Sequence, residues 1–283
     1  MPGSRIGSCA GNAPPAPAIR LKGEEPVPII TLLTDFGDQD GYVAAMKGVI
    51  LSIAPAATLV DITHAIAPQA VQQAAYVLAQ AAPFFPPGAI HVAVVDPGVG
   101  SARRPLAIQT PTAAFVGPDN GLFSLVTESA PSLTCVHLDQ PQFWRENPSR
   151  TFHGRDIFAP VAARLAQQTP LSQLGAPISD PVRLSLPAPQ RLPDGTVTGA
   201  IIHVDHFGNL ISNIPAAWLT AARWRVCIGP TTIAGVQPHF AATPPGALLA
   251  YCGSAGTLEI AVRNGSAGQA LGAGVGQSVV LEP

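Results

Sequence analysis

Three acidic residues come soon after apolar stretches of the chain, where strands are expected to end. Asp35 follows the run 27–33, Asp96 follows 89–95, and Asp119 lies just beyond a run that ends at Val116. In an open α/β sheet, ligands bind beyond the carboxyl ends of the strands, so these carboxylates are the first candidates for a binding or catalytic site. Because each lies close to Gly or Asn, the same residues could instead form Asx turns or cap helices.

Cationic side chains and an imidazole occur further along the chain. Arg103 and Arg104 follow Asp96 by seven and eight residues, and His153 lies in the polar sequence TFHGRD at 151–156. A carboxylate and an imidazole can orient or deprotonate a water molecule, and a fixed guanidinium can stabilise the negative charge that develops. The alternatives are a solvated pair of surface arginines, a histidine with a purely structural role, and an ion pair at the start of a helix.

Two more polar stretches interrupt strand-like sequence in the C-terminal part, DHFGN at 205–209 and GSAG at 253–256. Asp205 suits an ammonium group, Ser254 a carboxylate and Asn209 the edge of an adenine. The residue types therefore indicate an amino acid or a nucleobase as ligand. Each stretch also fits a β-bulge or a hairpin turn.

The elements that would position the first group of residues alternate between strands and helices. Strands are predicted at 27–33, 58–62, 89–95, 106–108 and 113–116, and helices at 42–51, 71–82 and 157–168. This alternation favours parallel strands joined by crossover helices. We expect an α/β fold, with an N-terminal α/β/α sandwich around a mostly parallel sheet.

A second, smaller domain is predicted beyond a proline-rich stretch. Residues 181–196 read as a linker, and short strand-like runs separated by Gly, Asn and Pro fill 197–283, which predicts a small all-β, barrel-like domain. The N-terminal domain then spans 27–180. Residues 1–26, rich in Pro, Ala, Gly and Ser, are expected to form a flexible leader without the apolar core of a signal peptide.

Composition excludes several classes of protein. The chain has 283 residues, of which 47% are hydrophobic and 11% charged, and its net charge of −2 provides no basic patch for nucleic acid or an anionic membrane. No apolar stretch is long enough to span a bilayer, and the four cysteines and seven histidines lack metal-binding spacing. Neither a dinucleotide fingerprint nor a P-loop occurs. We expect a cytoplasmic protein without metal, membrane or nucleic-acid partner.

The ordered set of motifs resembles the S-adenosyl-L-methionine (SAM) hydroxide adenosyltransferase family, which is related to fluorinating and chlorinating enzymes. The resemblance covers about residues 29–281. It rests on six stretches in matching order, which are TDFG at 34–37, DPGVG at 96–100, PDNGL at 118–122, FHGRD at 152–156, DHFGN at 205–209 and GSAG at 253–256.

The resemblance implies a reaction and an assembly. Water or hydroxide would attack C5′ of the ribose of SAM, and adenosine and L-methionine would be released without a metal or another cofactor, because the sulfonium is already a good leaving group. The protein would be a homotrimer, with SAM bound between the N-terminal domain of one subunit and the C-terminal domain of its neighbour.

Position by position, the resemblance also implies roles for individual residues. Asp96, Arg103 and His153 match the set that positions and polarises the attacking water, with the spacing selecting Arg103 over Arg104. Asp35 matches the carboxylate that takes both ribose hydroxyls. The remaining matches are Asp205 and Ser254 for the methionine end and Asn209 for the adenine.

Differences from the halogenating relatives point towards water as the nucleophile. Those relatives carry Tyr in place of Asp96, another residue in place of His153, and an extra loop between the arginines and the PDNGL motif. In the other direction, family members usually carry Asn where this chain has Gly253, and the halogenases have an aromatic residue near Gln69. A SAM or adenosine sensor without turnover and a halogenase remain as alternatives to a SAM hydrolase.

Overall fold

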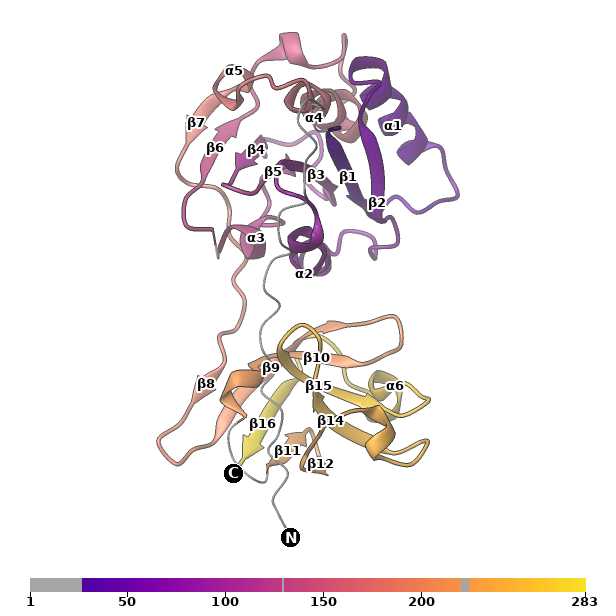
Figure 1. The fold of residues 1–283 in the computed structure, drawn as a ribbon, viewed down its shortest axis with the longest axis vertical. Coiled ribbons are helices and arrows are strands. Elements are labelled where there is room, and N and C mark those ends of the chain that lie inside the picture. The colour runs from indigo at the N-terminus through magenta and orange to yellow at the C-terminus, as the bar shows by residue number, and fades with distance from the viewer. Residues whose placement is uncertain (1–26, 129, 220–223) are drawn as a thin grey trace, which may run out of the picture. The chain divides into compact units, whose positions relative to one another are not determined.

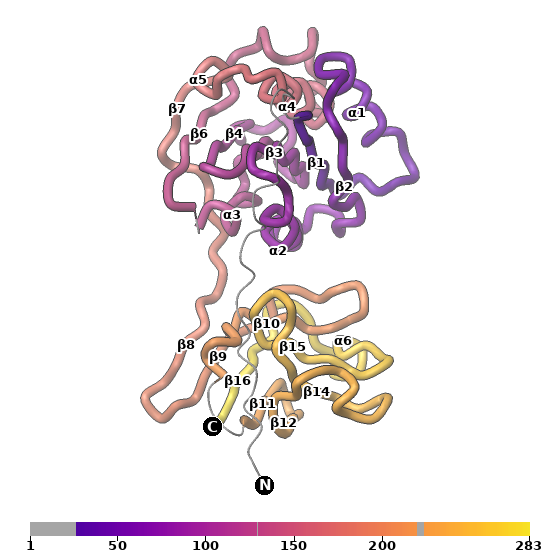
Figure 2. Tube along the Cα trace, in the orientation of Figure 1, coloured from indigo at the N-terminus to yellow at the C-terminus, as the bar shows by residue number. Residues whose placement is uncertain are grey.

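The computed structural model describes residues 27–128, 130–219 and 224–283, so the predicted leader at 1–26 lies outside the described residues. The described chain divides into two compact units, one ending at Leu184 and the other starting at Ser185 (Figures 1 and 2). Each unit is built around its own sheet. The division falls inside the stretch 181–196, for which the sequence predicts a linker.

The N-terminal unit contains a seven-stranded sheet in the order β2-β1-β3-β5-β4-β6-β7. β2, β1, β3 and β5 are parallel to one another, whereas β4 is antiparallel to β5 and β6, and β7 is antiparallel to β6. The strands are β1 (Ile29–Thr34), β2 (Thr58–Thr63), β3 (Ala89–Val94), β4 (Pro105–Gln109), β5 (Ala113–Pro118), β6 (Thr134–His137) and β7 (Ala176–Ile178).

Helices cover both faces of this sheet, which confirms the predicted α/β/α layering (Figure 1). On one face Met46 and Ile50 of α1 and Val161 of α4 join the core beneath β1 and β3, and on the other face Ala74 and Leu78 of α2 pack on the opposite sides of the same strands. The helices are α1 (Tyr42–Ile53), α2 (Val71–Ala81), α3 (Ser124–Glu128), α4 (Ala159–Ala166) and α5 (Leu171–Leu174), with short 3₁₀ turns η1 (Ala82–Phe84) and η2 (Pro141–Phe143).

The helix predicted at 157–168 has an irregular start. A π-helical turn, η3 (Gly154–Phe158), precedes α4, so the regular helix begins two residues later than predicted. Such widened turns occur often at functional sites, and here the turn follows His153 directly. The polar residues of 151–156 explain the difference, because the sequence pattern locates an apolar helix face but not the winding of its first turn.

The C-terminal unit is a nine-stranded, mostly antiparallel sheet that nearly closes into a barrel, which confirms the barrel-like prediction; only β13 and β14 pair in parallel among the described strands of this sheet. The strand order is β12-β11-β16-β9-β10-β15-β14-β13, with β8 on β9, and β12 contacts β14 near the other end of the order. The elements are β8 (Gln190–Arg191), β9 (Val197–Val204), β10 (Leu210–Pro215), η4 (Ala216–Trp218), β11 (Arg225–Ile228), β12 (Thr231–Ala234), β13 (Val236–Gln237), η5 (Phe240–Ala242), β14 (Leu248–Cys252), β15 (Thr257–Val262), α6 (Ala267–Leu271) and β16 (Ser278–Glu282).

Candidate active site

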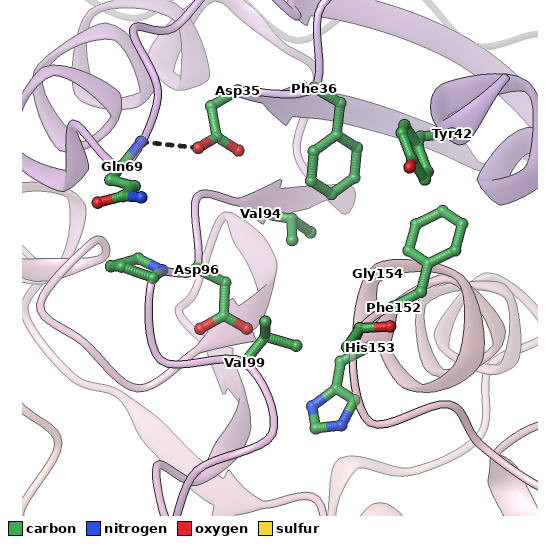
Figure 3. Close-up of a pocket in the computed structure, with 12 residues that line it drawn as sticks. Asp35, Phe36, Tyr42, Gln69, Val94, Asp96, Val99, Phe152, His153 and Gly154 are labelled. Atoms are coloured by element: carbon green, nitrogen blue, oxygen red, sulfur yellow. Dashed lines mark hydrogen bonds between the residues drawn. The ribbon is translucent and has the colours of Figure 1, made fainter. Parts of the chain in front are cut away.

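A pocket of about 440 Å³ opens at the carboxyl edge of the parallel half of the N-terminal sheet. Asp35 follows β1 and Asp96 follows β3, and because β1 and β3 are parallel neighbours both carboxylates reach the same pocket. His153 and Gly154 complete the lining from the start of η3 (Figure 3). The volume falls within the range of about 300–1,000 Å³ that is usual for small-molecule sites.

Asp96, Arg103 and His153 form one hydrogen-bonded network. Nε of Arg103 donates to both carboxylate oxygens of Asp96 at 2.9 and 3.0 Å, and Nη2 of Arg103 also donates to Asp96. The same Nη2 lies 2.8 Å from Nδ1 of His153. The side chains of Arg103 and Asp96 are only 9% and 6% exposed, so their charges act on each other with little screening by solvent.

The network determines the protonation of His153. A guanidinium has only donors, so Nδ1 of His153 must accept from Arg103 and the ring proton lies on Nε2. Burial lowers the pKa of His153, and the positive charge of Arg103 lowers it further, while Asp96 and Asp156 act weakly in the opposite direction. His153 is therefore a neutral imidazole at physiological pH, with one N–H to donate.

The loop that carries Asp96 and the loop that carries His153 touch at Gly100. Gly100 has φ +78°, and a Cβ at this position would lie 2.5 Å from the carbonyl oxygen of Arg150. Only glycine allows both this conformation and this close approach. The contact fixes the spacing between the two loops and hence between the ends of the network.

Asp156 anchors the loop that ends in His153. Its buried carboxylate accepts hydrogen bonds from the side chains of Arg145 and Arg155 and from the backbone N–H of Ser149. Burial acts to raise the pKa of Asp156, but these partners outweigh burial and hold the pKa below its ordinary value. Asp156 is therefore a structural anion, as one of the alternative interpretations of the sequence had it.

Asp119, the third acidic residue after a strand, is not part of the pocket. Its buried carboxylate pairs with Arg104 and accepts a hydrogen bond from the backbone N–H of Val182 at 2.7 Å. Arg104 also donates to Asp180 at 2.9 Å. The two adjacent arginines therefore have different partners. Arg103 lies in the network with Asp96, whereas Arg104 and Asp119 together bind the segment 180–182.

One wall of the pocket is aromatic, a feature that the sequence analysis did not single out. Phe36, Tyr42 and Phe152 pack edge to face or tilted, with ring centroids 5.2 to 5.9 Å apart. Figure 3 shows these rings on the side of the pocket away from Asp35 and Gln69. Phe36 and Phe152 are sequence neighbours of the candidate residues Asp35 and His153. Nothing in the sequence indicates a place in the pocket for Tyr42, because a residue at a helix start is usually solvated.

In the C-terminal unit, Asp205 and Asn209 are held by their own turn, which connects β9 and β10. Asp205 accepts hydrogen bonds from the backbone N–H groups of Phe207 and Asn209 at 2.9 and 2.8 Å, and from Nδ2 of Asn209 at 2.8 Å. These two residues are brought together, whereas Ser254 stands exposed on the turn between β14 and β15.

A buried carboxyl group that sequence reasoning missed, Glu259, lies beneath the turn that carries Ser254. Tyr251 donates a hydrogen bond to Oε2 of Glu259. A Cβ on Gly253 would lie 1.8 Å from Oε1 of Glu259, so glycine at this position lets the carboxyl group lie directly against the turn. Burial raises the pKa of Glu259, and the negative charge of Asp205 adds to this effect. The strand-like sequence of residues 258–262 predicted that Glu259 lies in a strand, but nothing in that sequence indicated a site.

Among the residues that the structure describes, no group of three His, Cys, Asp or Glu side chains has the arrangement of a metal site. Within the same residues, no helix combines the length and apolar character that crossing a bilayer requires.

Fold and pocket together define a class of protein: a two-unit α/β protein with a barrel-like C-terminal unit and a polar pocket at the carboxyl edge of its N-terminal sheet. Comparison with known proteins narrows this class. The model of the SAM hydroxide adenosyltransferase N-terminal domain matches residues 30–175, and the model of the C-terminal domain of that family matches residues 199–280. The chain belongs to the SAM hydroxide adenosyltransferase family.

Individual relatives agree with this assignment. The (R)-S-adenosyl-L-methionine hydrolase of Salinispora arenicola is 42% identical over 252 residues, which cover 86% of this chain and 94% of the relative. A fluorinase of Actinoplanes sp. is 31% identical over 213 residues, covering 66% and 72% of the two chains. The crystal structure of an uncharacterized conserved protein from Thermotoga maritima superposes with a TM-score of 0.84 at 37% identity, covering 89% of this chain and 100% of that one.

Proposed function

We propose that the protein hydrolyses SAM to adenosine and L-methionine in the pocket beside Asp96. The oxygen of water forms a bond to C5′ of the ribose, the C5′–S bond breaks, and its electron pair stays on sulfur, which becomes the neutral thioether of methionine. One proton of the attacking water is released. The relative from Salinispora arenicola carries the name of this activity, and its 42% identity over most of the chain supports the assignment.

The observation that carries the proposal is the buried network of Asp96, Arg103 and His153 at the pocket. In this network Asp96 retains lone pairs that can accept from a water molecule, and His153 can donate from Nε2. Nη1 of Arg103 is buried and has no hydrogen-bond partner among the described residues, which makes it a further donor that a water molecule could satisfy. A water held in this way presents a lone pair for in-line attack.

The geometry favours Asp96 over His153 as acceptor of the departing proton. His153 could accept only at Nδ1, which Arg103 already occupies. We therefore assign His153 to orienting the water, Asp96 to accepting from it, and Arg103 to holding both and stabilising hydroxide character as it develops.

The remaining residues are assigned to substrate recognition. Asp35 takes the ribose hydroxyls, Asp205 and Ser254 hold the methionine end, and Asn209 contacts the adenine. The proposal includes no cofactor and no metal. It also includes a cytoplasmic homotrimer whose substrate site lies at a subunit interface, and light scattering of the purified protein would test it by giving a mass three times that of the chain.

The deciding experiment is to incubate the protein with SAM in water enriched in oxygen-18. Chromatography with mass detection should find adenosine and methionine in equal amounts, with the heavy oxygen in the 5′-hydroxyl of adenosine. Tight binding of SAM without methionine would instead support a sensor. A 5′-halogenated nucleoside formed in the presence of chloride or fluoride would support a halogenase, the activity named for the Actinoplanes relative.

A further inference from the structure

A row of side chains behind the pocket holds the segment 35–37, and the proposed chemistry does not use them. Thr34 ends β1, and its Oγ1 lies 2.9 Å from Nδ1 of His64. Nε2 of His64 lies 3.0 Å from Asp61, and Lys47 donates to the other oxygen of Asp61 at 2.6 Å. The order hydroxyl, imidazole, carboxylate is that of a nucleophilic triad, but Thr34 is fully buried and cannot reach a substrate. The row must therefore serve position rather than attack.

Each residue of this segment is tied to the row or to the loop that follows it. The N–H of Phe36 donates to Oγ1 of Thr34 at 3.2 Å, and the N–H of Gly37 donates to the carbonyl oxygen of His64 at 2.9 Å. The carboxylate of Asp35 accepts from the N–H of Gln69 at 2.8 Å. His64 and Gln69 lie on one loop, between β2 and α2, so that loop determines where Asp35 and Phe36 stand.

The backbone of Gln69 is strained in a way that supports this interpretation. Its φ is +66°, in the left-handed region that residues other than glycine rarely adopt. Strained residues of this kind persist where the surrounding structure fixes them, and they gather at functional sites. Here the unusual conformation accompanies an N–H aimed at Asp35, as Figure 3 shows.

With a neutral imidazole at His64, the hydrogen atoms of the row have one consistent arrangement. Burial acts to raise the pKa of Asp61, but Lys47 and His64 outweigh burial and keep Asp61 an anion. An anion 3.0 Å from Nε2 favours a proton on that nitrogen, so Nδ1 accepts from the hydroxyl of Thr34. The oxygen of Thr34 in turn accepts from Phe36.

We infer that His64 and Thr34 are positioning residues, which aim the Asp35 carboxylate at the ribose hydroxyls of the nucleoside. The inference rests on the proposed function, in which Asp35 binds the ribose. It adds residues that contact no substrate and act only through the segment 35–37.

The test is nucleoside binding by the full chain, measured by calorimetry with adenosine and with 2′,3′-dideoxyadenosine, which lacks both ribose hydroxyls. Thr34→Val removes the hydroxyl while keeping the shape of the side chain. We expect this variant to bind adenosine roughly tenfold more weakly, as for the loss of one hydrogen bond, and to bind the dideoxynucleoside as the wild type does. Thr34→Ser, which keeps the hydroxyl, should behave as the wild type with both ligands.

His64 offers a matched pair of variants. His64→Asn keeps a polar atom near the position of Nδ1, and His64→Gln keeps one near the position of Nε2. We expect His64→Asn to retain more adenosine affinity than His64→Gln, because the bond between Nδ1 and Thr34 is the one that connects His64 to the segment 35–37. In turnover with SAM, KM should rise more than kcat falls.

If Thr34→Val weakened the binding of adenosine and of the dideoxynucleoside equally, the inference would be overturned. Such a result would indicate a general disturbance of the fold and not a loss of contacts to the ribose hydroxyls. Unchanged adenosine affinity in a folded Thr34→Val would also overturn the inference. Binding is read without chemistry, so a wild type that binds adenosine through its ribose hydroxyls but never releases methionine from SAM would contradict the proposed function and leave the inference standing.

Discussion

The candidate residues of the N-terminal pocket and those of the C-terminal unit are held in different ways. Asp96 and Arg103 are linked to His153, which comes from a segment 50 residues further along the chain. Asp205 and Asn209, by contrast, bond to each other within one turn. The first group is organised by the fold before any ligand binds. The second group must share or exchange its internal hydrogen bonds when a ligand arrives, so its contribution to binding is expected to be smaller.

The largest effect should come from Asp96→Asn. This change keeps the size of the side chain but removes the charge that pairs with Arg103 and the acceptor for the proton of water, and we expect turnover of SAM to fall by about 10³-fold. Asp119→Asn is the matched control, because Asp119 also pairs with an arginine but lies outside the pocket. It should lower stability and leave kcat per folded molecule close to wild type. Similar losses of kcat in both variants would contradict the conclusion that Asp96, and not Asp119, belongs to the catalytic pocket.

Gly100→Ala should reduce turnover by about 100-fold, because a Cβ 2.5 Å from Arg150 would push apart the loops that carry Asp96 and His153. Gly88→Ala is the control. Gly88 also has a positive φ, +91°, but no atom lies within 4 Å of a Cβ placed there. Steady-state kinetics of the two variants separate backbone strain from loop spacing. Equal losses in kcat would mean that strain alone explains the effect.

Asp205→Ala should affect stability and binding together. The substitution removes the acceptor of three hydrogen bonds, so we expect the free energy of unfolding to fall by about 1–3 kcal/mol. Adenosine affinity should fall roughly tenfold, because Asn209, assigned to the adenine, loses the partner that holds its side chain. Asp35→Ala should lower adenosine affinity with little loss of stability, because within residues 27–128, 130–219 and 224–283 the bond from Gln69 is the one hydrogen bond to its carboxylate. Urea unfolding of both variants measures the loss of stability, and calorimetry with adenosine measures the loss of affinity. A stable Asp205→Ala would show that the turn does not depend on this carboxylate.

Acid should affect the N-terminal network through His153. Burial and Arg103 lower the pKa of His153 below its ordinary 6.5, so the ring stays neutral at pH 6.5 and gains a proton only in more acidic solution. Because the folded state binds this proton less readily than the unfolded state, stability and the bond to Arg103 are both lost as pH falls through the lowered pKa. We expect kcat/KM to change less than twofold between pH 8 and about 6.5 and to drop below that. A drop that begins well above pH 6.5 would contradict the neutral assignment.

The smallest effect should come from Phe207→Ala, in the turn that contains Asp205 and Asn209. The side chain of Phe207 is 74% exposed, so its removal should change the free energy of unfolding by less than about 0.5 kcal/mol. Thermal unfolding of Phe207→Ala, measured alongside Asp205→Ala, checks this expectation. A large loss of stability would show that another surface covers the ring in solution.

The sequence predicted the layers of the fold because apolar periodicity and turn residues are local signals. It also placed Asp35 and Asp96 at one sheet edge, since parallel neighbouring strands end together. It could not predict that Asp205 and Asn209 pair with each other, because both residue types fit a turn and a ligand equally well. Nor could it find Glu259 or the contact of Gly100 with Arg150, because these depend on distances between segments that no local pattern encodes.

The adjacent arginines place a limit on how this loop can change in length. Arg103 serves the pocket, whereas Arg104 together with Asp119 ties down residues 180–182, although one peptide bond separates the two arginines. Loss of one residue between Asp96 and Arg103 would bring the second guanidinium to the place of the first and leave Asp119 without its partner. The number of residues between Asp96 and β4 is therefore constrained as well as the identity of Gly100 and the two arginines, and a deletion there would damage catalysis and folding in a single step.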